Sequence, residues 1–101
     1  MKIRIVSDSL AHLGFEELLD TAAELGVAGI EVNTGDWSAA PHLDLANLLA
    51  DAAARQRFRD AFERRGLEPI GLNANGNQLH PTDGARQSST VHATLRLAGL
   101  L

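Results

Sequence analysis

The sequence predicts an α/β fold made of three consecutive strand–helix units with parallel strands. Short segments with alternating apolar and polar residues are each followed by a longer segment whose apolar residues recur at helical spacing. One unit is also repeated, because G-V-A-G-I-E-V-N at 26–33 aligns with G-L-E-P-I-G-L-N at 66–73, an offset of 66 minus 26, or 40. Strands that alternate with helices form a parallel sheet.

The predicted strands span residues 2–8, 27–33 and 67–73. In the first strand, Ile3 and Ile5 alternate with polar residues, which is the period-two pattern of a strand with one buried face. The third strand contains Pro69, which has no N–H to donate, so we expect this strand to pair mainly beyond that residue.

The predicted helices span residues 15–25, 44–50, 52–65 and 88–101. The second and third are separate helices because their apolar residues lie on faces about 180° apart when each residue turns the helix by about 100°. Asp44 and Asp51 are the expected N-caps of these two helices. We expect Ser88, Ser89 or Thr90 to cap the last helix.

The two faces of the predicted strands differ in polarity, and this difference indicates the kind of sheet. One face carries Ile3, Ile5, Ile30, Val32, Ile70 and Leu72, and the other carries Arg4, Asp8, Gly29, Glu31, Gly71 and Asn73. A doubly wound, flavodoxin-like sheet has helices on both faces and nearly continuous apolar strands. The polar second face therefore favours part of a (βα)8 TIM barrel, whose strands turn one side to the lumen.

A closed barrel of this type takes eight βα units and about 250 residues. The 101 residues form one domain, 1–101, with three units, so the sequence predicts an incomplete barrel with open sheet edges. We expect a fragment of a longer chain, a truncated gene product or an obligate homo-oligomer that covers those edges.

Composition excludes several classes of function. The chain has no cysteine, which excludes disulfides and thiolate metal sites. The net charge of −4 argues against nucleic acid as a partner. No apolar run is long enough to span a membrane, and the first residues do not form a signal peptide, so we expect a cytoplasmic protein with no membrane partner.

Polar side chains gather where the strands end. They are Asp8, Asn33, Trp37, Asn75, Asn77 and His80. Amide and imidazole groups in a loop after a strand suit the binding of a small hydrophilic ligand, and Trp37 offers an aromatic surface for a sugar. The alternatives are a solvated Asn/Gly-rich turn for the loop, a packing role for Trp37, and a hydrogen-bonding role for His80.

Three segments carry a resemblance to a known family. M-K-I-R-I-V-S-D-S-L, A-A-E-L-G-V-A-G-I-E-V-N-T-G-D-W-S and L-N-A-N-G-N-Q-L-H-P resemble the amino-terminal part of sugar phosphate isomerase/epimerases of the xylose isomerase-like TIM-barrel superfamily. Gln78 stands where the family pattern has proline. The resemblance spans nearly the whole chain and implies its first three βα units.

This resemblance implies an isomerase or epimerase that moves a proton next to the carbonyl of a sugar or polyol, with a divalent metal (Mn, Mg, Co or Zn) as cofactor. It makes His80 a candidate metal ligand. The catalytic carboxylates are expected on later strands, and none is assigned within these residues, so we expect the isolated chain to be inactive. The alternative is a non-catalytic sugar-binding or oligomeric module derived from the same barrel.

Overall fold

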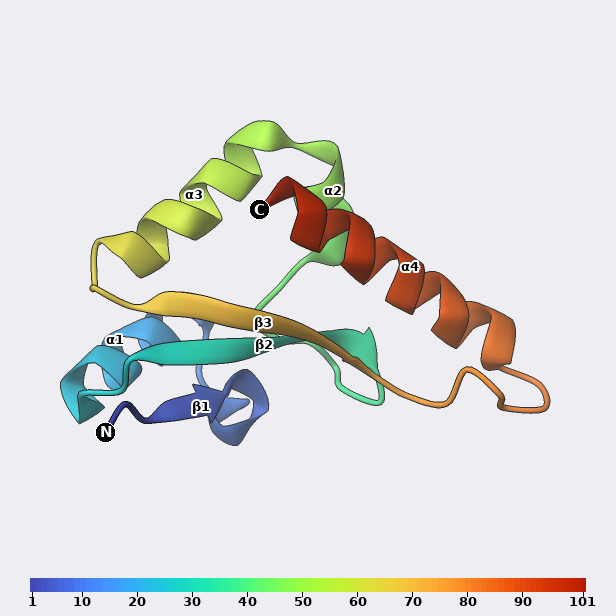
Figure 1. The fold of residues 1–101 in the computed structure, drawn as a ribbon, viewed down its shortest axis with the longest axis horizontal. Coiled ribbons are helices and arrows are strands. Elements are labelled where there is room, and N and C mark those ends of the chain that lie inside the picture. The colour runs from blue at the N-terminus through green and yellow to red at the C-terminus, as the bar shows by residue number, and fades with distance from the viewer.

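The computed structural model describes all 101 residues and contains a three-stranded sheet with helices packed against it (Figure 1). All strands are parallel and lie in the order β1-β2-β3. This confirms a parallel α/β arrangement of three βα units in an open sheet. The elements are β1 Arg4–Val6, η1 Ser7–Leu10, α1 Phe15–Leu25, β2 Gly29–Asp36, α2 Leu45–Ala50, α3 Ala52–Glu63, β3 Glu68–Asn75 and α4 Gly84–Leu100.

A single hydrophobic core joins every α-helix to the central strand. Ile30 and Val32 of β2 are completely buried and belong to one cluster with residues of all four helices, namely Leu18, Leu19, Ala22, Leu48, Ala54, Phe58, Ala61, Phe62 and Leu97. Side chains two apart in a strand point to the same face. The helices therefore share one face of the sheet, and the face that carries Glu31 has no helix of this chain over it.

The first strand is shorter than predicted. β1 covers Arg4–Val6, and the predicted strand at 2–8 is wrong at both ends, since Ile3 is mostly exposed and Ser7 begins the 3-10 helix η1. The Ser7 hydroxyl accepts a hydrogen bond from the Asn33 N–H, 3.0 Å away. The ladder between β1 and β2 ends at the pair Val6–Glu31, and this side-chain bond ties the start of η1 to β2 as the chain turns away from the sheet.

The second and third strands follow the 40-residue offset of the repeat only in their middle, from the pair Glu31–Gly71 to the pair Asn33–Asn73, because the register shifts both before Glu31 and after Asn33. Asn33 and Asn73 are register partners, and both strands run beyond the predicted ends to Asp36 and Asn75. An irregularity follows Pro69, because Ile30 is opposite Pro69 whereas the next residue is opposite Gly71. The extra residue of this bulge is Ile70.

The bulge overturns the expected place of Ile70 in the core. Its side chain is 40% exposed and lies against Gly29, where a Cβ would be 2.6 Å from Ile70 Cγ2. Proline removes one ladder donor, and the strand accommodates this loss by an extra residue. The apolar face predicted from simple alternation is therefore smaller than expected.

The first three α-helices follow the sequence pattern closely. α1 has the predicted bounds and ends at Gly26, whose φ of 76° is the left-handed conformation that glycine adopts most easily. Asp44 Oδ1 accepts from Asn47 N at 3.1 Å and Asp51 Oδ1 accepts from Ala53 N at 2.8 Å, so both predicted caps are confirmed. α3 ends two residues earlier than predicted, at Glu63.

The last helix begins four residues before its predicted start, and the expected serine or threonine cap is wrong. α4 starts at Gly84, and the turn before it is held by His80, whose Nδ1 accepts from Thr82 N at 3.2 Å and Asp83 N at 3.0 Å. These bonds close the turn ahead of α4, and no side chain caps the N–H groups of the helix's first turn. None of the helices combines the length and apolar character that crossing a membrane requires.

Replacement of Phe62 should test the shared core. Phe62 is 1% exposed and its ring contacts those of Phe15 and Phe58, with centroids 6.0 and 5.1 Å away. We expect Phe62→Ala to lower the free energy of unfolding by about 3 to 5 kcal/mol in urea titrations. The control Leu95→Ala, at a position 64% exposed on α4, should change it by less than about 0.5 kcal/mol. Equal losses would contradict the assignment of the core.

Candidate functional site

The carboxyl ends of the three strands lie at one end of the sheet and carry most of the predicted site residues. Next to β1, Asn33 of β2 is 2% exposed and is tied through its backbone to Ser7. Asn33 Oδ1 and Asp8 Oδ1 are both buried and have no hydrogen-bond partner. Buried polar atoms without a hydrogen-bond partner are uncommon and costly. No group of this chain donates to these two oxygens.

Asn75 and Trp37 are brought together where β2 and β3 end. Trp37 N donates to the Asn75 carbonyl at 2.8 Å, and Ser38 N donates to Asn75 Oδ1 at 3.3 Å. The backbone at Trp37 is therefore held in place while its indole is 73% exposed. The packing alternative for Trp37 is not what the structure shows.

The loop between β3 and α4 holds Asn77 and His80 by hydrogen bonds to the backbone. Asn77 Oδ1 accepts from Leu79 N at 3.0 Å, and Asn77 N donates to the side-chain oxygen of Gln87. His80 Nδ1 is the acceptor for the N–H groups of Thr82 and Asp83, which directly precede α4. A neutral imidazole that accepts at Nδ1 carries its proton on Nε2, which makes Nε2 a donor.

The arrangement bears on the metal predicted from the resemblance. No three His, Cys, Asp or Glu side chains converge in this chain in a way that could hold a metal ion. To bind a metal through Nε2, a neutral His80 would have to move its proton to Nδ1 and give up both bonds from the backbone. These residues alone do not provide a metal site, so we derive no chemical step through a metal here.

Asp36 is the residue that the sequence patterns did not reveal. Its side chain has no exposed surface, and neither carboxylate oxygen has a hydrogen-bond partner. Arg86 Nη1 lies 3.6 Å from Asp36 Oδ1, which is an ion pair without a hydrogen bond. Asp36 also has a φ of 67°, uncommon for a residue other than glycine. In the sequence, the polar residues around Asp36 indicate a turn but do not indicate that its side chain is buried.

Gly76 allows Asp36 to lie beneath the β3–α4 loop. A Cβ on Gly76 would be 2.7 Å from the Asp36 Cβ and still closer to the Gln87 side-chain oxygen. Gln87 is 3% exposed, and its amide nitrogen donates to Asp83 Oδ2 at 3.1 Å. The loop is thus packed onto the end of β2 by close contacts and buried polar groups.

Arg86 connects this buried cluster to the surface. Its guanidinium donates to both oxygens of Asp83, with Nη2 only 2.6 Å from Oδ2. These hydrogen bonds, together with the one from Gln87, lower the pKa of Asp83 from 3.8 to about 2. Arg86 is therefore engaged with one exposed and one buried carboxylate, and its own pKa is raised mainly by the bond to Asp83.

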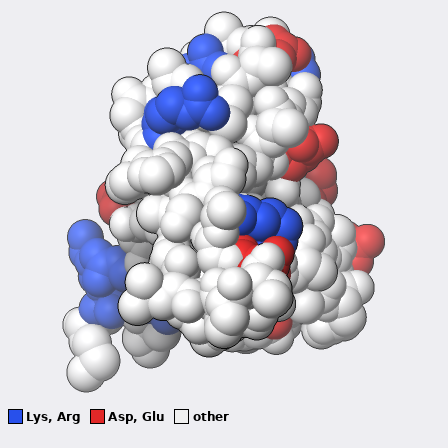
Figure 2. All heavy atoms as spheres, turned by 90° about the vertical axis from the view of Figure 1, so that its right-hand side faces the viewer, with Lys and Arg blue, Asp and Glu red and all other residues white.

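Figure 2 shows the molecule from the end toward which the strands point. Uncharged side chains cover most of this view, and basic and acidic groups are scattered among them. No wide basic patch of the kind that binds nucleic acid is visible on this face.

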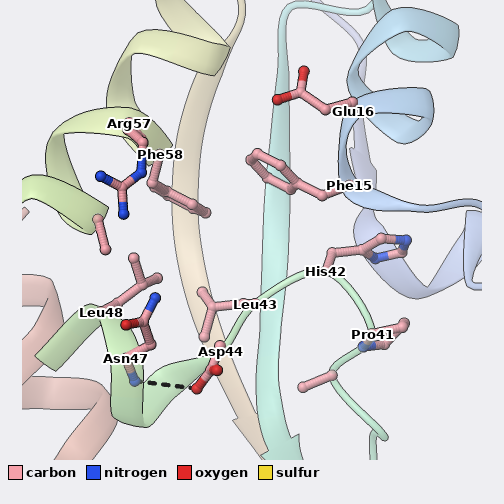
Figure 3. A pocket seen from close by; sticks show the side chains of 12 residues that line it. Phe15, Glu16, Pro41, His42, Leu43, Asp44, Asn47, Leu48, Arg57 and Phe58 are labelled. Atoms are coloured by element: carbon pink, nitrogen blue, oxygen red, sulfur yellow. Dashed lines mark hydrogen bonds between the residues drawn. The ribbon is translucent and has the colours of Figure 1, made fainter. Parts of the chain in front are cut away.

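The largest cavity lies elsewhere, among the helices and the loop that precedes α2. It measures about 480 Å³ and has Phe15, Leu43, Leu48 and Phe58 in its apolar part (Figure 3). His42 also lines it, but its ring is turned away from the two phenylalanine rings, and Nε2 donates to the Leu13 carbonyl at 2.8 Å. The cavity contains none of the predicted site residues, so we regard it as a gap in helix packing.

Comparisons with known proteins give one sequence relative. The chain is 44% identical over 102 aligned residues to an uncharacterized protein, YfiH, of Bacillus subtilis strain 168. The alignment covers the whole of this chain but only 33% of the relative, so the chain spans about a third of the length of that relative. No protein-family model and no solved structure matches it.

Substitution of Gly76 should test the close contact between the loop and β2. We expect Gly76→Ala to lower the free energy of unfolding by about 1 to 3 kcal/mol, because the methyl group overlaps Asp36. Gly99→Ala is the control, since a Cβ there meets nothing within 4 Å and alanine favours helix by up to about 1 kcal/mol. Thermal unfolding monitored by circular dichroism measures both. A Gly76→Ala protein as stable as wild type would contradict the close packing.

The Asp83 carboxyl should titrate unusually low. Its stabilising effect on the fold is present above pH 3.8 and is lost as the pH falls toward about 2, because its folded-state pKa is depressed. We expect Arg86→Gln to raise this pKa toward 3.8, as followed by the Asp83 carboxyl carbon in NMR titrations. Arg57→Gln, on α3, is the control and should leave it unchanged. An Asp83 midpoint that is the same with and without Arg86 would disprove the coupling.

Proposed function

We propose that this chain is the amino-terminal part of a sugar isomerase or epimerase built on a xylose isomerase-like TIM barrel, and that it supplies part of the substrate-binding surface. The observation that carries the proposal is the one-sided sheet. Apolar strand residues face helices, while polar residues such as Asn33 and Asn75 collect at the carboxyl ends of parallel strands. In TIM barrels the active site is built at that end.

The buried oxygens of Asp8 and Asn33 support the same proposal. Neither oxygen is accessible to solvent in this chain, so a sugar hydroxyl could donate to them only after a local opening, which would remove the cost of about 1 to 3 kcal/mol that an unpaired buried polar atom carries. Asp8 belongs to η1, directly after β1, and Asn33 lies in the second half of β2, where its N–H is bonded to Ser7 of η1. Their place agrees with the role in substrate binding that the resemblance implies.

The reaction would move a proton between the substrate carbon next to a carbonyl and a base, and then return a proton to the same or the neighbouring carbon. Within this chain, the proposed contribution is binding and orientation. The divalent metal (Mn, Mg, Co or Zn) would polarise the carbonyl when bound, and its ligands would come from residues beyond these 101, where the catalytic carboxylates are also proposed. The greater length of the Bacillus relative leaves room for such residues.

The second candidate is a non-catalytic sugar-binding or oligomeric module. The exposed apolar side chains of Val6 and Ile70 favour it, because these residues lie on the two edge strands of the sheet, and exposed Ile3 directly precedes β1. A second copy of the chain is the partner that this candidate proposes.

Exchange of substrate hydrogen with solvent tests the enzymatic proposal. The chain is expressed together with the coding sequence that follows it and is incubated in D₂O with Mn²⁺ and a panel of ketoses and their phosphates. We expect deuterium at the carbon next to the carbonyl of at least one sugar. Asn33→Ala should lower kcat/KM about tenfold, the effect of about 1.4 kcal/mol, which is within the range of a lost hydrogen bond.

Asn47→Ala is the matched control, because Asn47 is exposed on α2 and its side chain makes no hydrogen bond to the protein. It should keep the wild-type rate. The absence of deuterium from every sugar, combined with retained sugar binding, would reject the enzyme in favour of the module.

A further inference from the structure

We propose that Asn75 and Gly76 form a site of spontaneous deamidation, and that this modification irreversibly opens the loop between β3 and α4. The closed loop protects the pair, so the reaction takes place only when the loop leaves β2. The isoaspartate that results then prevents the loop from closing again. Water is the co-reactant, and the proposal is independent of the proposed function.

The chemistry needs an asparagine followed by an unhindered nitrogen, and residues 75–76 are the chain's single Asn-Gly pair. The Gly76 nitrogen attacks Asn75 Cγ, the bond from Cγ to the amide nitrogen breaks, and that nitrogen leaves as ammonia with the proton from Gly76. A five-membered succinimide remains. Water adds to either ring carbonyl and breaks its bond to nitrogen, which gives aspartate or isoaspartate without oxidation or reduction. Glycine favours the attack because it has no Cβ.

The structure separates this pair from a second labile one, Asp83–Gly84, which could form the same ring. Gly84 N donates to the His80 carbonyl at 3.1 Å, and the Asp83 carboxylate is bonded to Arg86. The attacking nitrogen and the group that it would attack are therefore both engaged. Gly76 N, in contrast, donates to no protein atom. We infer that the nitrogen is available at residue 76 and is not available at residue 84.

Two hydrogen bonds keep the ring from closing while the loop is packed on β2. The Asn75 carbonyl accepts from Trp37 N at 2.8 Å, and Asn75 Oδ1 accepts from Ser38 N at 3.3 Å. The two carbonyl groups of a succinimide point away from each other, on either side of the ring nitrogen, whereas these two oxygens accept from consecutive N–H groups. Ring closure therefore breaks at least one of the bonds, and its rate depends on local opening of the loop.

Isoaspartate does not fit the closed loop. It adds one atom to the main chain beside Gly76, where the contact with Asp36 leaves no room even for a Cβ. The carbonyl that accepts from Trp37 N leaves the main chain and becomes a carboxylate. This charge lies close to Asp36, which is fully buried without a hydrogen-bond partner, and the neighbouring cation, Arg86, is already bonded to Asp83. Repulsion between the carboxylates favours the open loop.

The experiment follows the 101-residue chain for weeks at mildly alkaline pH, both folded and unfolded in urea. The tryptic peptide 66–86 contains Asn73, Asn75, Asn77 and Asp83, so its fragmentation in a mass spectrometer assigns each product to one residue. We expect deamidation at Asn75 before the other two asparagines, and no isoaspartate at Asp83 in the folded chain. The reaction at Asn75 should be at least about tenfold slower in the folded chain than in urea, because the loop has to open first.

Gln87→Ala tests the role of the loop, because the buried Gln87 side chain accepts from Asn77 N and donates to Asp83. We expect deamidation at Asn75 to become about tenfold faster, the effect of a lost hydrogen bond on the opening equilibrium. Gln56→Ala is the matched control, since it makes the same change at an exposed position of α3. It should change the rate by less than about twofold.

Hydrogen exchange of the Trp37 N–H measures opening without any substitution, because this group is bonded to the Asn75 carbonyl. We expect its protection in the purified deamidated chain to fall by at least about tenfold. Equal rates in the folded chain and in urea, equal effects of the two substitutions, an earlier reaction at Asn73 or Asn77, or unchanged protection of Trp37 after deamidation would each overturn the proposal.

Discussion

The packing of four helices against a single face of the sheet is the constraint on which the rest of this structure depends. Ile30 and Val32 are completely buried and belong to one apolar cluster to which every α-helix contributes side chains. Once all the helices lie on that face, the other face of the sheet has no apolar partner within the chain. Polar residues at the ends of the strands are the consequence, and the candidate site is located among them.

Backbone N–H groups determine the chemistry of the loop that follows β3. The side-chain acceptors of Asn75, Asn77 and His80 each hold a backbone N–H of a neighbouring turn. The same bonds therefore stabilise the loop and decide which atoms remain for a ligand. A loop that is rich in asparagine can be read as solvated turn structure or as a binding loop, and here one set of hydrogen bonds supports both descriptions.

The positions of some residues near the candidate site could be predicted from the sequence, and those of others could not. Asn33, Trp37 and Asn75 were predicted to lie near the carboxyl ends of the strands, and the structure places Asn33 in the second half of β2, Trp37 directly after β2 and Asn75 at the end of β3, because parallel strands bring these ends together. Asp36 and Gln87 could not be found in this way. Their importance comes from burial beneath the loop, and burial depends on Gly76 and on a strand that continues past its expected end. His80 was noticed for its chemistry, whereas its observed bonds hold the beginning of α4.

The sequence by itself determined the order of strands and helices, the two aspartate caps, the glycine that ends α1, and the alignment of Asn33 with Asn73. All of these follow from local backbone preferences or from a repeat, so they can be read without knowing what lies nearby in space. Tertiary structure alone decided the bulge at Ile70, the early start of α4 and the burial of Asp36. Each of these depends on contacts between segments distant in the sequence or on how a loop folds back on itself. Hydrophobic periodicity reports local secondary structure and cannot predict such contacts.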